Sequence, residues 1–259
     1  MNDPCADEFI ALANRLADAA GDVSRGFFRR EIAVEYKAAK SPVTEADHAV
    51  ETRLREMISE AYPDHGMIGE EQAAVNADAE FVWVIDPIDG TRLFISGVPL
   101  FTCLIALVQG GRPVLGVIDQ PVIGDRWVGA RGQATRFNGR GVHSRACASL
   151  EDAVLCTSNP AYFEGPDIAA FERLRDAAGW THYGGDSYAV GLIANGAMDM
   201  AVESELGVYD FCAWGPVIEG AGGVVSDWRG APITLETGDK ILVSGDAGLH
   251  DQAMARLAG

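Results

Sequence analysis

The feature that most constrains the fold is an uninterrupted apolar run, residues 81–85, followed directly by Asp86-Pro87-Ile88-Asp89-Gly90-Thr91. Five apolar residues in succession indicate a strand that is covered on both faces. Pro87 cannot donate a ladder hydrogen bond, which places Asp86 at the carboxyl end of that strand. Ligand sites in α/β sheets gather at this edge, and Gly90 lets the backbone approach a ligand closely. The segment therefore indicates a metal-dependent phosphate site, with an ordinary Asp/Gly turn as the alternative.

Apolar spacing divides the chain into two differently organised halves. Before the apolar run, helical spacing predicts helices over residues 8–30 and about 44–61. After it, runs at 101–108 and 114–118, joined by a Gly-rich turn, predict a strand pair that residues 126–130 extend. From about residue 144, strands and helices alternate, as in α/β proteins. The strands expected there are 153–157, 180–183, 198–202, 224–226 and 241–244, and the helices are 168–178, 187–195, 211–221 and 249–257.

The length of the chain and the absence of a linker bear on its domain organisation. A globule of 259 residues buries about 70–75% of its unfolded surface and needs no disulfides. No repeat and no Pro/Gly/Ser-rich linker separates the α+β half, about 1–143, from the α/β half, about 144–259. We therefore expect one catalytic domain spanning residues 1–259, built from packed layers.

Charge and cysteine usage restrict the partners and the compartment. The 38 acidic and 20 basic residues leave a formal net charge of −18. Such a field repels nucleic acid and anionic membranes over a Debye length of ~8 Å, so we expect neither as a partner. We find no signal peptide and no run of the ~18–20 apolar residues that span a membrane. The five cysteines are scattered and form no C-x-x-C pair, which indicates reduced thiols in a cytoplasmic protein.

Acidic residues stand at the edges of several predicted elements: Asp47, Glu70 with Glu71, Asp86 with Asp89, and Asp210. If they converge, two like charges about 4 Å apart would cost about 4 kcal/mol at an effective dielectric near 20. Hard cations with oxygen ligands would remove that cost. Each residue also has a local alternative. Asp47 could close a capping box with Thr44. Glu70 could lie on a solvated edge, and Asp210 could cap a helix that starts at Phe211.

Other hydrolytic chemistries lack their sequence signatures. There is no G-x-x-x-x-G-K-[ST] loop, no G-x-S-x-G elbow and no cysteine with an arginine six positions later. The histidines show no H-x-x-x-H spacing, which disfavours a zinc hydrolase. A haloacid-dehalogenase-type phosphatase with an aspartyl-phosphate intermediate is one alternative, although its D-x-D-G-T turn has one residue between the aspartates where this chain has two. A catalytically silent magnesium- or phosphate-binding regulator is another.

Several motifs in order resemble the inositol monophosphatase superfamily: Gly69-Glu70-Glu71, then residues 83–91, then Tyr209-Asp210 and Glu219-Gly220-Ala221-Gly222-Gly223. The resemblance extends from Lys40 to Asp227, which is nearly the whole chain. It implies a layered αβαβα sandwich of the inositol-monophosphatase and sugar-phosphatase type. It also implies a phosphoric monoester hydrolase that uses Mg²⁺, and the family commonly forms homodimers.

Within that superfamily the chain is most similar to the histidinol-phosphatase branch. That branch carries D-P-I-D-G-T-K/R-x-F-I-x-G, seen here at residues 86–97, and Y-G-G-D-x-Y, seen here at residues 183–188. Inositol monophosphatases usually have threonine where Arg92 stands and W-D where Tyr209-Asp210 stands. Leu93 departs from the small polar residue common in both branches, which leaves the choice of substrate open.

The resemblance also implies a ligand set for two to three Mg²⁺ ions. One ion would be held by Glu70, Asp86 and the carbonyl of Ile88. A second would be held by Asp86, Asp89 and Asp210, and a third, weaker ion would lie near Glu70 through waters. Direct attack of a metal-activated water on phosphorus would follow, without a covalent intermediate.

By the same resemblance, Thr91, hydrogen-bonded to Asp47, would orient and help to deprotonate the attacking water, so Asp47, Glu70 and Thr91 form the catalytic set. Gly90 and Thr91 would bind phosphate oxygens through their backbone amides. The remaining substrate contacts are assigned to Asp89, Arg92, Asp186 and Glu203.

Asp186 and Glu203 would select the alcohol half of the substrate. Histidinol phosphate carries an ammonium group and a titratable imidazole, which carboxylates complement by charge-assisted hydrogen bonds. Glu203 could instead lie on a solvated strand end. We expect a small phosphomonoester substrate, with histidinol phosphate and a role in histidine biosynthesis as the leading interpretation. Inositol 1-phosphate, another sugar phosphate or a nucleotide phosphate is the alternative.

Overall fold

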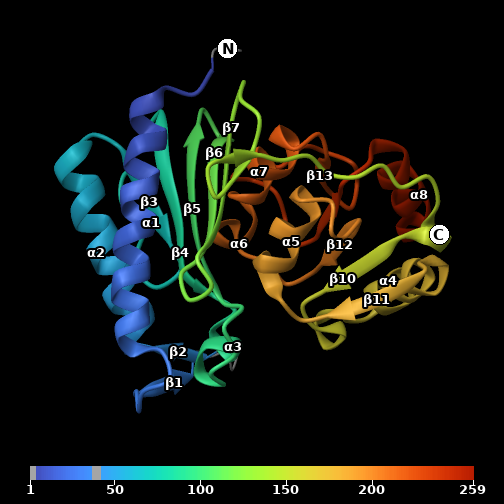
Figure 1. The fold of residues 1–259 in the computed structure, drawn as a ribbon, viewed down its shortest axis with the longest axis horizontal. Helices are drawn as coiled ribbons and strands as arrows, with labels where there is room; N and C mark the ends of the chain where they lie inside the picture. Colours follow the sequence, from blue (N-terminus) through green and yellow to red (C-terminus); the bar gives the residue numbers. More distant parts are fainter. Residues whose placement is uncertain (1–3, 37–41) are drawn as a thin grey trace.

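The computed structural model describes residues 4–36 and 42–259 of the chain. Helices and sheets alternate in layers, which Figure 1 shows side by side from a helix pair at one edge to a second helix pair at the opposite edge. This arrangement confirms the layered αβαβα fold. Lys40, at which the family resemblance begins, lies outside the described residues.

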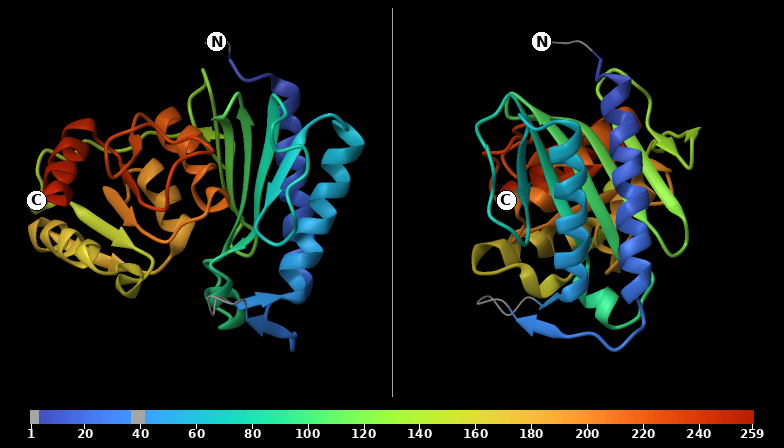
Figure 2. Two further views of the ribbon diagram at one scale, coloured as in Figure 1. Left: turned by 180° about the vertical axis from the view of Figure 1, so that it is seen from behind. Right: turned by 90° about the vertical axis from the view of Figure 1, so that its left-hand side faces the viewer.

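The outer layer of the N-terminal half is a helix pair, α1 (Asp7–Phe27) and α2 (Glu45–Ala61). The right-hand view of Figure 2 shows both helices crossing the same face of the first sheet. Neither α1 nor any other helix within the described ranges is long and apolar enough to cross a membrane. A buried stripe at every fourth position faces the sheet in each helix. It consists of Leu12, Leu16 and Ala20 in α1 and of Val50, Leu54 and Ile58 in α2.

The first sheet consists, in spatial order, of β3 (Gly66–Gly69), β4 (Phe81–Asp89), β5 (Thr102–Gln109), β6 (Arg112–Gln120), β7 (Asp125–Ala130), β8 (Arg136–Phe137) and β9 (Arg140–Gly141). β3 pairs with β4 in parallel, and the other neighbours pair antiparallel. The predicted strand pair and its extension correspond to β5, β6 and β7. The two-residue strands β8 and β9 were not expected from the sequence.

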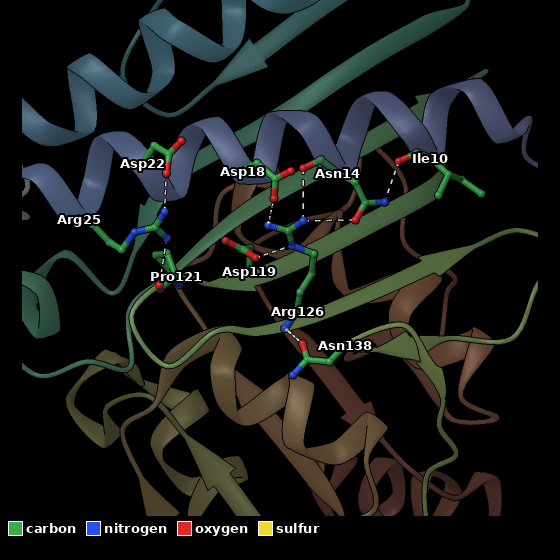
Figure 3. Close-up of polar contacts among 9 residues, drawn as sticks. All are labelled: Ile10, Asn14, Asp18, Asp22, Arg25, Asp119, Pro121, Arg126 and Asn138. Carbon is green, nitrogen blue, oxygen red and sulfur yellow. Dashed lines mark hydrogen bonds and ion pairs between the residues drawn. The ribbon is translucent and has the colours of Figure 1, made fainter.

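Arg126 joins a buried ion pair within this sheet to an exposed aspartate of α1, as Figure 3 shows. Arg126 of β7 donates from Nε to Oδ1 of Asp119 in β6 at 2.6 Å. The same guanidinium pairs with Asp18 of α1 at 2.8 Å. Asp119 is 4% exposed, so its charge is compensated chiefly by Arg126. The pair therefore holds the helix layer against two strands at once.

The inner helix layer and the second sheet come from the C-terminal half. The inner helices are α5 (Asp186–Ala194), α6 (Val208–Phe211) and α7 (Trp214–Gly220). The second sheet consists, in spatial order, of β11 (Trp180–Tyr183), β10 (Val154–Thr157), β12 (Met200–Glu203), β14 (Ile241–Ser244) and β13 (Val224–Asp227). β10 is parallel to both neighbours, whereas β14 is antiparallel to both of its own. The outer helices α4 (Pro166–Ala177) and α8 (Ala247–Ala258) cover its far face.

Short elements connect these layers. They are β1 (Val34–Tyr36) paired with β2 (Pro42–Thr44), α3 (Thr91–Ile95), and 3-10 helices at Leu150–Asp152 and Pro160–Tyr162.

The inner helix layer lies unusually close to the first sheet. A Cβ atom on Gly116 of β6 would lie 2.1 Å from the carbonyl oxygen of Ala213, and one on Gly129 of β7 would lie 2.2 Å from that of Pro216. Only glycine permits such approach. The close packing fixes α6 and α7 relative to β4 and β5, and with them the side chains that α6 presents.

The strand that carries the aspartates does not end at Asp86, as the sequence predicted, but continues to Asp89. Asp86 pairs with Leu104 and Asp89 pairs with Thr102, so the register shifts between them. Three residue steps along β4 therefore correspond to two along β5, so β4 has one extra residue there and forms a β-bulge. Pro87 lies within the bulge, where its missing N–H costs no ladder bond.

Two helix predictions also need correction. The predicted helix 211–221 is divided into α6 and α7, because Pro216 has no N–H to bond the carbonyl of Cys212 one turn earlier. Asp210 therefore lies inside α6 rather than before a helix. The helix predicted over 8–30 ends at Phe27, and Arg29 has a left-handed φ of 59°.

Candidate active site

A cleft of about 460 Å³ opens where the bulged end of β4 meets the ends of β10 and β12 and the starts of α5 and α6. Most of the predicted site residues line it: Glu70, Asp89, Gly90, Thr91, Arg92, Asp186, Glu203 and Asp210. Asp47, Asp86 and Ile88 are almost fully buried and do not line the cleft. The chain segments involved are far apart in sequence, so the cleft is a product of the layered fold.

Three carboxylates form an acidic group at the cleft, with Asp89 and Asp210 lining it and Asp86 buried beside them. Ligand oxygens of Asp86, Asp89 and Asp210 all lie within 4.8 Å of one another. The β4 bulge presents the first two. Asp86 accepts the Ile88 N–H at 3.0 Å, and Asp210 accepts the Gly207 N–H at 2.6 Å. Asp89 accepts bonds from the Thr102 hydroxyl and the Ser187 N–H, so each of the three carboxylates is held by at least one hydrogen bond.

The carboxylates disfavour one another's charge. Burial, followed by the charges of Glu70, Asp89 and Asp210, raises the pKa of Asp86 well above its usual range. Burial, followed by Asp89 and Glu70, likewise raises the pKa of Asp210. Burial and the charge of Asp186 raise the pKa of Asp89 to about 7. A hard divalent cation would relieve this repulsion and matches a donor set made entirely of carboxylate oxygens.

Glu70 lies near the three-carboxylate group but is not part of it. It directly follows β3, the parallel neighbour of β4, so both strands deliver carboxylates to the same edge. Its charge raises the pKa of Asp86, of Asp210 and, as a smaller contribution, of Asp47. Glu70 is therefore placed to supply a further ligand on one side of the group.

Asp47 performs its local capping role and also faces Thr91. Its Oδ2 accepts the N–H and hydroxyl of Thr44 at 2.8 and 2.5 Å, which completes the predicted capping box. Its Oδ1 lies 3.5 Å from Oγ1 of Thr91. Thr91 also donates to the carbonyl of Ile88 at 3.0 Å. The two interpretations of Asp47 are therefore compatible, because they use different oxygens.

One end of the cleft, which adjoins the three-carboxylate group through Asp186, holds two further carboxylates that share one partner, Ser158. Glu203 is 4% exposed and accepts the N–H and hydroxyl of Ser158 at 2.7 and 3.0 Å. Burial raises the pKa of Glu203 to about 8. Burial also raises the pKa of Asp186, against the lowering effects of a hydrogen bond from Ser158 and of the charge of Arg92. Glu203 is thus not on a solvated strand end.

Arg92 and Asp186 are both held in defined positions beside this end. The Arg92 guanidinium lies over the ring of Tyr162, 5.4 Å from its centroid. Asp186 follows two left-handed glycines and itself has a φ of 42°. A Cβ on Gly90 would come within 2.9 Å of Oδ2 of Asp186. Gly90 is therefore needed where the two halves of the chain meet.

Several residues of the site were missed by sequence reasoning. Ser158 and Tyr162 line the cleft near Asp186 and Glu203, and Thr102 and the Ser187 N–H each bond Oδ2 of Asp89 at 2.9 Å. Glu51 is buried beneath the loop that carries Glu70. Its only sequence signal was the i, i+4 spacing from Arg55, which on a helix is typical of surface ion pairs.

Comparison with known proteins agrees with this geometry. The fold and the acidic cleft are those of a phosphoric monoester hydrolase. The model of the inositol monophosphatase family matches residues 6–258, and the chain belongs to that family. Enzymes of this family generally use Mg²⁺, for which the three-carboxylate group is a suitable site.

Individual relatives carry different substrate names. The chain is 41% identical over 266 residues to the bifunctional phosphatase IMPL2 of Arabidopsis thaliana, covering 99% of this chain and 77% of that protein. It is 38% identical to the histidinol-phosphatase of Chlorobaculum parvum, covering 85% and 86%. The structure of an inositol monophosphatase from Zymomonas mobilis superposes with a TM-score of 0.90 at 42% identity, covering 98% of each chain.

Proposed function

We propose that this enzyme hydrolyses histidinol phosphate to histidinol and phosphate. The observation that carries the proposal is the pair of buried carboxylates, Asp186 and Glu203, which gather around Ser158 beside the three-carboxylate group and form what we call the alcohol end of the cleft. A cationic alcohol half would stabilise the charged forms of both carboxylates, which burial disfavours, whereas a neutral polyol would not. Similarity to named histidinol-phosphatases supports the same substrate.

We assign the cation ligands to Glu70, Asp86, Asp89, Asp210 and the Ile88 carbonyl, for two to three Mg²⁺ ions. When bound, such ions supply Lewis-acid stabilisation of the phosphoryl and leaving-group oxygens and increase the acidity of water, worth several kcal/mol. The protein's own contribution is to hold the carboxylates at fixed positions through the Thr102, Ser187 and Gly207 hydrogen bonds.

Proton transfer is assigned to Thr91 and Asp47. The Thr91 hydroxyl orients the attacking water and accepts a hydrogen bond from it. As the attack proceeds, Thr91 Oγ1 takes up the proton of the water and passes its own hydroxyl proton, which it donates to the Ile88 carbonyl in this structure, to Asp47 Oδ1, 3.5 Å away. The raised pKa of Asp47, which arises mainly from burial, favours its acting as a base near neutral pH. Backbone amides of Gly90 and Thr91 hold the phosphate oxygens.

A panel of substrates tests the proposal. We would measure Mg²⁺-dependent phosphate release from histidinol phosphate, inositol 1-phosphate, a sugar phosphate and a 3′-phosphonucleotide, and compare kcat/KM. We expect histidinol phosphate to exceed the others by at least about tenfold, the smallest effect of one charge-assisted contact. A higher kcat/KM for any of the others would overturn the substrate assignment. Acid quenching should trap no phosphoenzyme, because water attacks phosphorus directly.

Inositol 1-phosphate is the second candidate, because the Zymomonas mobilis protein is named an inositol monophosphatase. Both substrates carry a phosphate that Arg92 could bind, so the alcohol half, which would lie beside Asp186 and Glu203, must distinguish them. The proposal further includes a cytoplasmic homodimer that acts in histidine biosynthesis. Light scattering coupled to size-exclusion chromatography would test the dimer.

A further inference from the structure

We propose that Glu51 and Arg55 of α2 form a clamp that positions Glu70 and thereby sets the affinity of the site for divalent cations. The proposal rests on the cation site described above but not on the identity of the phosphomonoester. Glu51 and Arg55 are positioning residues, because neither lines the cleft.

Glu51 holds the loop that follows β3 by its backbone. It is 0% exposed, its Oε2 accepts the Glu71 N–H at 2.8 Å, and its Oε1 accepts the Gln72 N–H at 3.1 Å. A Cβ on Gly69 would lie 2.0 Å from Glu51 Oε1, so only glycine allows the strand end to pass the carboxylate. Glu70 stands between Gly69 and Glu71, and its backbone is thus constrained on both sides.

Arg55 completes the clamp from the same helix. Its Nε donates to Glu51 Oε1 at 2.8 Å, which compensates the buried charge. Its two terminal nitrogens donate to the carbonyls of Gln72 and Ala73, each at 3.1 Å. Glu51 therefore binds N–H groups and Arg55 binds carbonyl groups of the same short segment, 71–73. The two side chains together specify both its position and its orientation.

The surroundings show why this clamp acts on the site. Beyond it, residues 73–78 are exposed, and the loop returns through a backbone bridge between Met67 and Val75. Glu70 lies at the other end of the clamp and acts electrostatically on Asp86 and Asp210. A buried ion pair of this kind contributes little net stability compared with apolar residues. We therefore attribute to it the positioning of the loop. Residues behind metal ligands typically change metal affinity 10–100-fold when replaced.

The test uses the full-length metal-free protein and calorimetric titration with Mg²⁺. In Glu51→Gln, one amide N–H₂ must face either the Arg55 donor or a backbone N–H, which disrupts the clamp at constant size. We expect Mg²⁺ affinity to fall about 10–100-fold and amide exchange at Glu71 and Gln72 to accelerate. Turnover at saturating Mg²⁺ should stay near the wild-type value, since no clamp atom touches substrate.

Asp119→Asn is the matched control, because it disrupts a comparable buried pair with Arg126 (Figure 3), and neither residue lines the cleft or contacts the loop that carries Glu70. It should lower thermal stability without changing Mg²⁺ affinity. Equal Mg²⁺ affinity in Glu51→Gln and wild type would overturn the clamp, whatever the loss of stability. If Glu51→Gln fails to fold, the Mg²⁺ affinity of Arg55→Lys provides the same test. Lysine keeps the positive charge but cannot donate to both backbone carbonyls as the guanidinium does.

The outcomes separate this inference from the proposed function. Weak turnover of histidinol phosphate with a weakened Mg²⁺ affinity in Glu51→Gln would refute the substrate and support the clamp. Wild-type protein that binds no Mg²⁺ would refute both.

Discussion

The two ends of the cleft differ in how their buried carboxylates are arranged. At one end, Asp86, Asp89 and Asp210 face one another within 4.8 Å, and each has its pKa raised in part by neighbouring carboxylates. At the other end, Glu203 is surrounded by donors, with Ser158 supplying both its N–H and its hydroxyl. Both groups accept hydrogen bonds, but the first also sets three carboxylates against one another, which is unfavourable until a cation enters.

Under the proposed function, this difference assigns catalysis and substrate recognition to separate groups of carboxylates within one cleft. The three-carboxylate group retains unrelieved repulsion, which a hard cation converts into binding free energy. The alcohol end has its carboxylates oriented beforehand by Ser158, so a cationic group meets acceptors that need little rearrangement. Substitutions at the first end should therefore act on turnover and metal binding, and those at the second on substrate selection and stability.

The largest effect should come from Asp89→Asn at the metal end. Loss of one charged ligand removes several kcal/mol of transition-state stabilisation, so we expect turnover to fall by roughly 1,000-fold or more. The fold should persist, because the variant also removes a buried like charge. Phosphate release at saturating Mg²⁺ and a thermal melt would measure both. Wild-type turnover in Asp89→Asn would sink the metal assignment.

The next effect concerns the alcohol end. Asp186→Ala should raise KM for histidinol phosphate about 10- to 100-fold, the value of a hydrogen bond to a charged group, and should raise KM for a neutral phosphomonoester far less. Asp186→Asn is the control for shape, because asparagine also tolerates the left-handed φ of 42°. Equal effects of either variant on both substrates would argue against charge recognition.

A smaller effect should appear in the pH dependence of metal binding. The pKa of Asp89 is about 7 before a cation binds, so protons compete with Mg²⁺ below that pH. The Mg²⁺ concentration for half-maximal activity should rise up to about tenfold per pH unit between pH 7 and 6, and excess Mg²⁺ should restore the rate. A requirement for Mg²⁺ that is constant over this range would contradict the prediction.

The smallest expected effect is on stability. The pKa of Glu203 rises from 4.5 to about 8 on folding, so the folded state binds an extra proton between these values. Its contribution to stability is full below 4.5 and is lost as the pH rises through 8. Metal-free wild type should therefore melt at lower temperature as the pH rises from 5 to 8. The melting temperature of Glu203→Gln should fall less steeply with pH. An identical slope in the variant and the wild type would disprove the titration of Glu203 in this range.

Much of the fold could be read from local patterns. The apolar run at 81–85 is the buried part of β4, and the four-residue spacing of Leu12 and Leu16 marks the buried side of α1. The strand boundary at Asp86 was wrong, because the bulge depends on where Thr102 and Leu104 of β5 pair. The residues around Asp86 cannot predict the register in which a neighbouring strand will pair.

The sequence by itself determined which residues can carry the chemistry, because carboxylates, glycines and apolar runs can be recognised from patterns only a few positions long. Only the tertiary structure decided which of them meet. Ser158 and Glu203 are 45 positions apart, Ser187 and Asp89 are 98 apart, and Glu51 reaches Glu71 across 20. Burial and hydrogen bonding between such distant segments arise from the packing of layers, which brings ordinary acidic residues together as the three-carboxylate group, the Ser158-bound carboxylates and the Glu51–Arg55 pair.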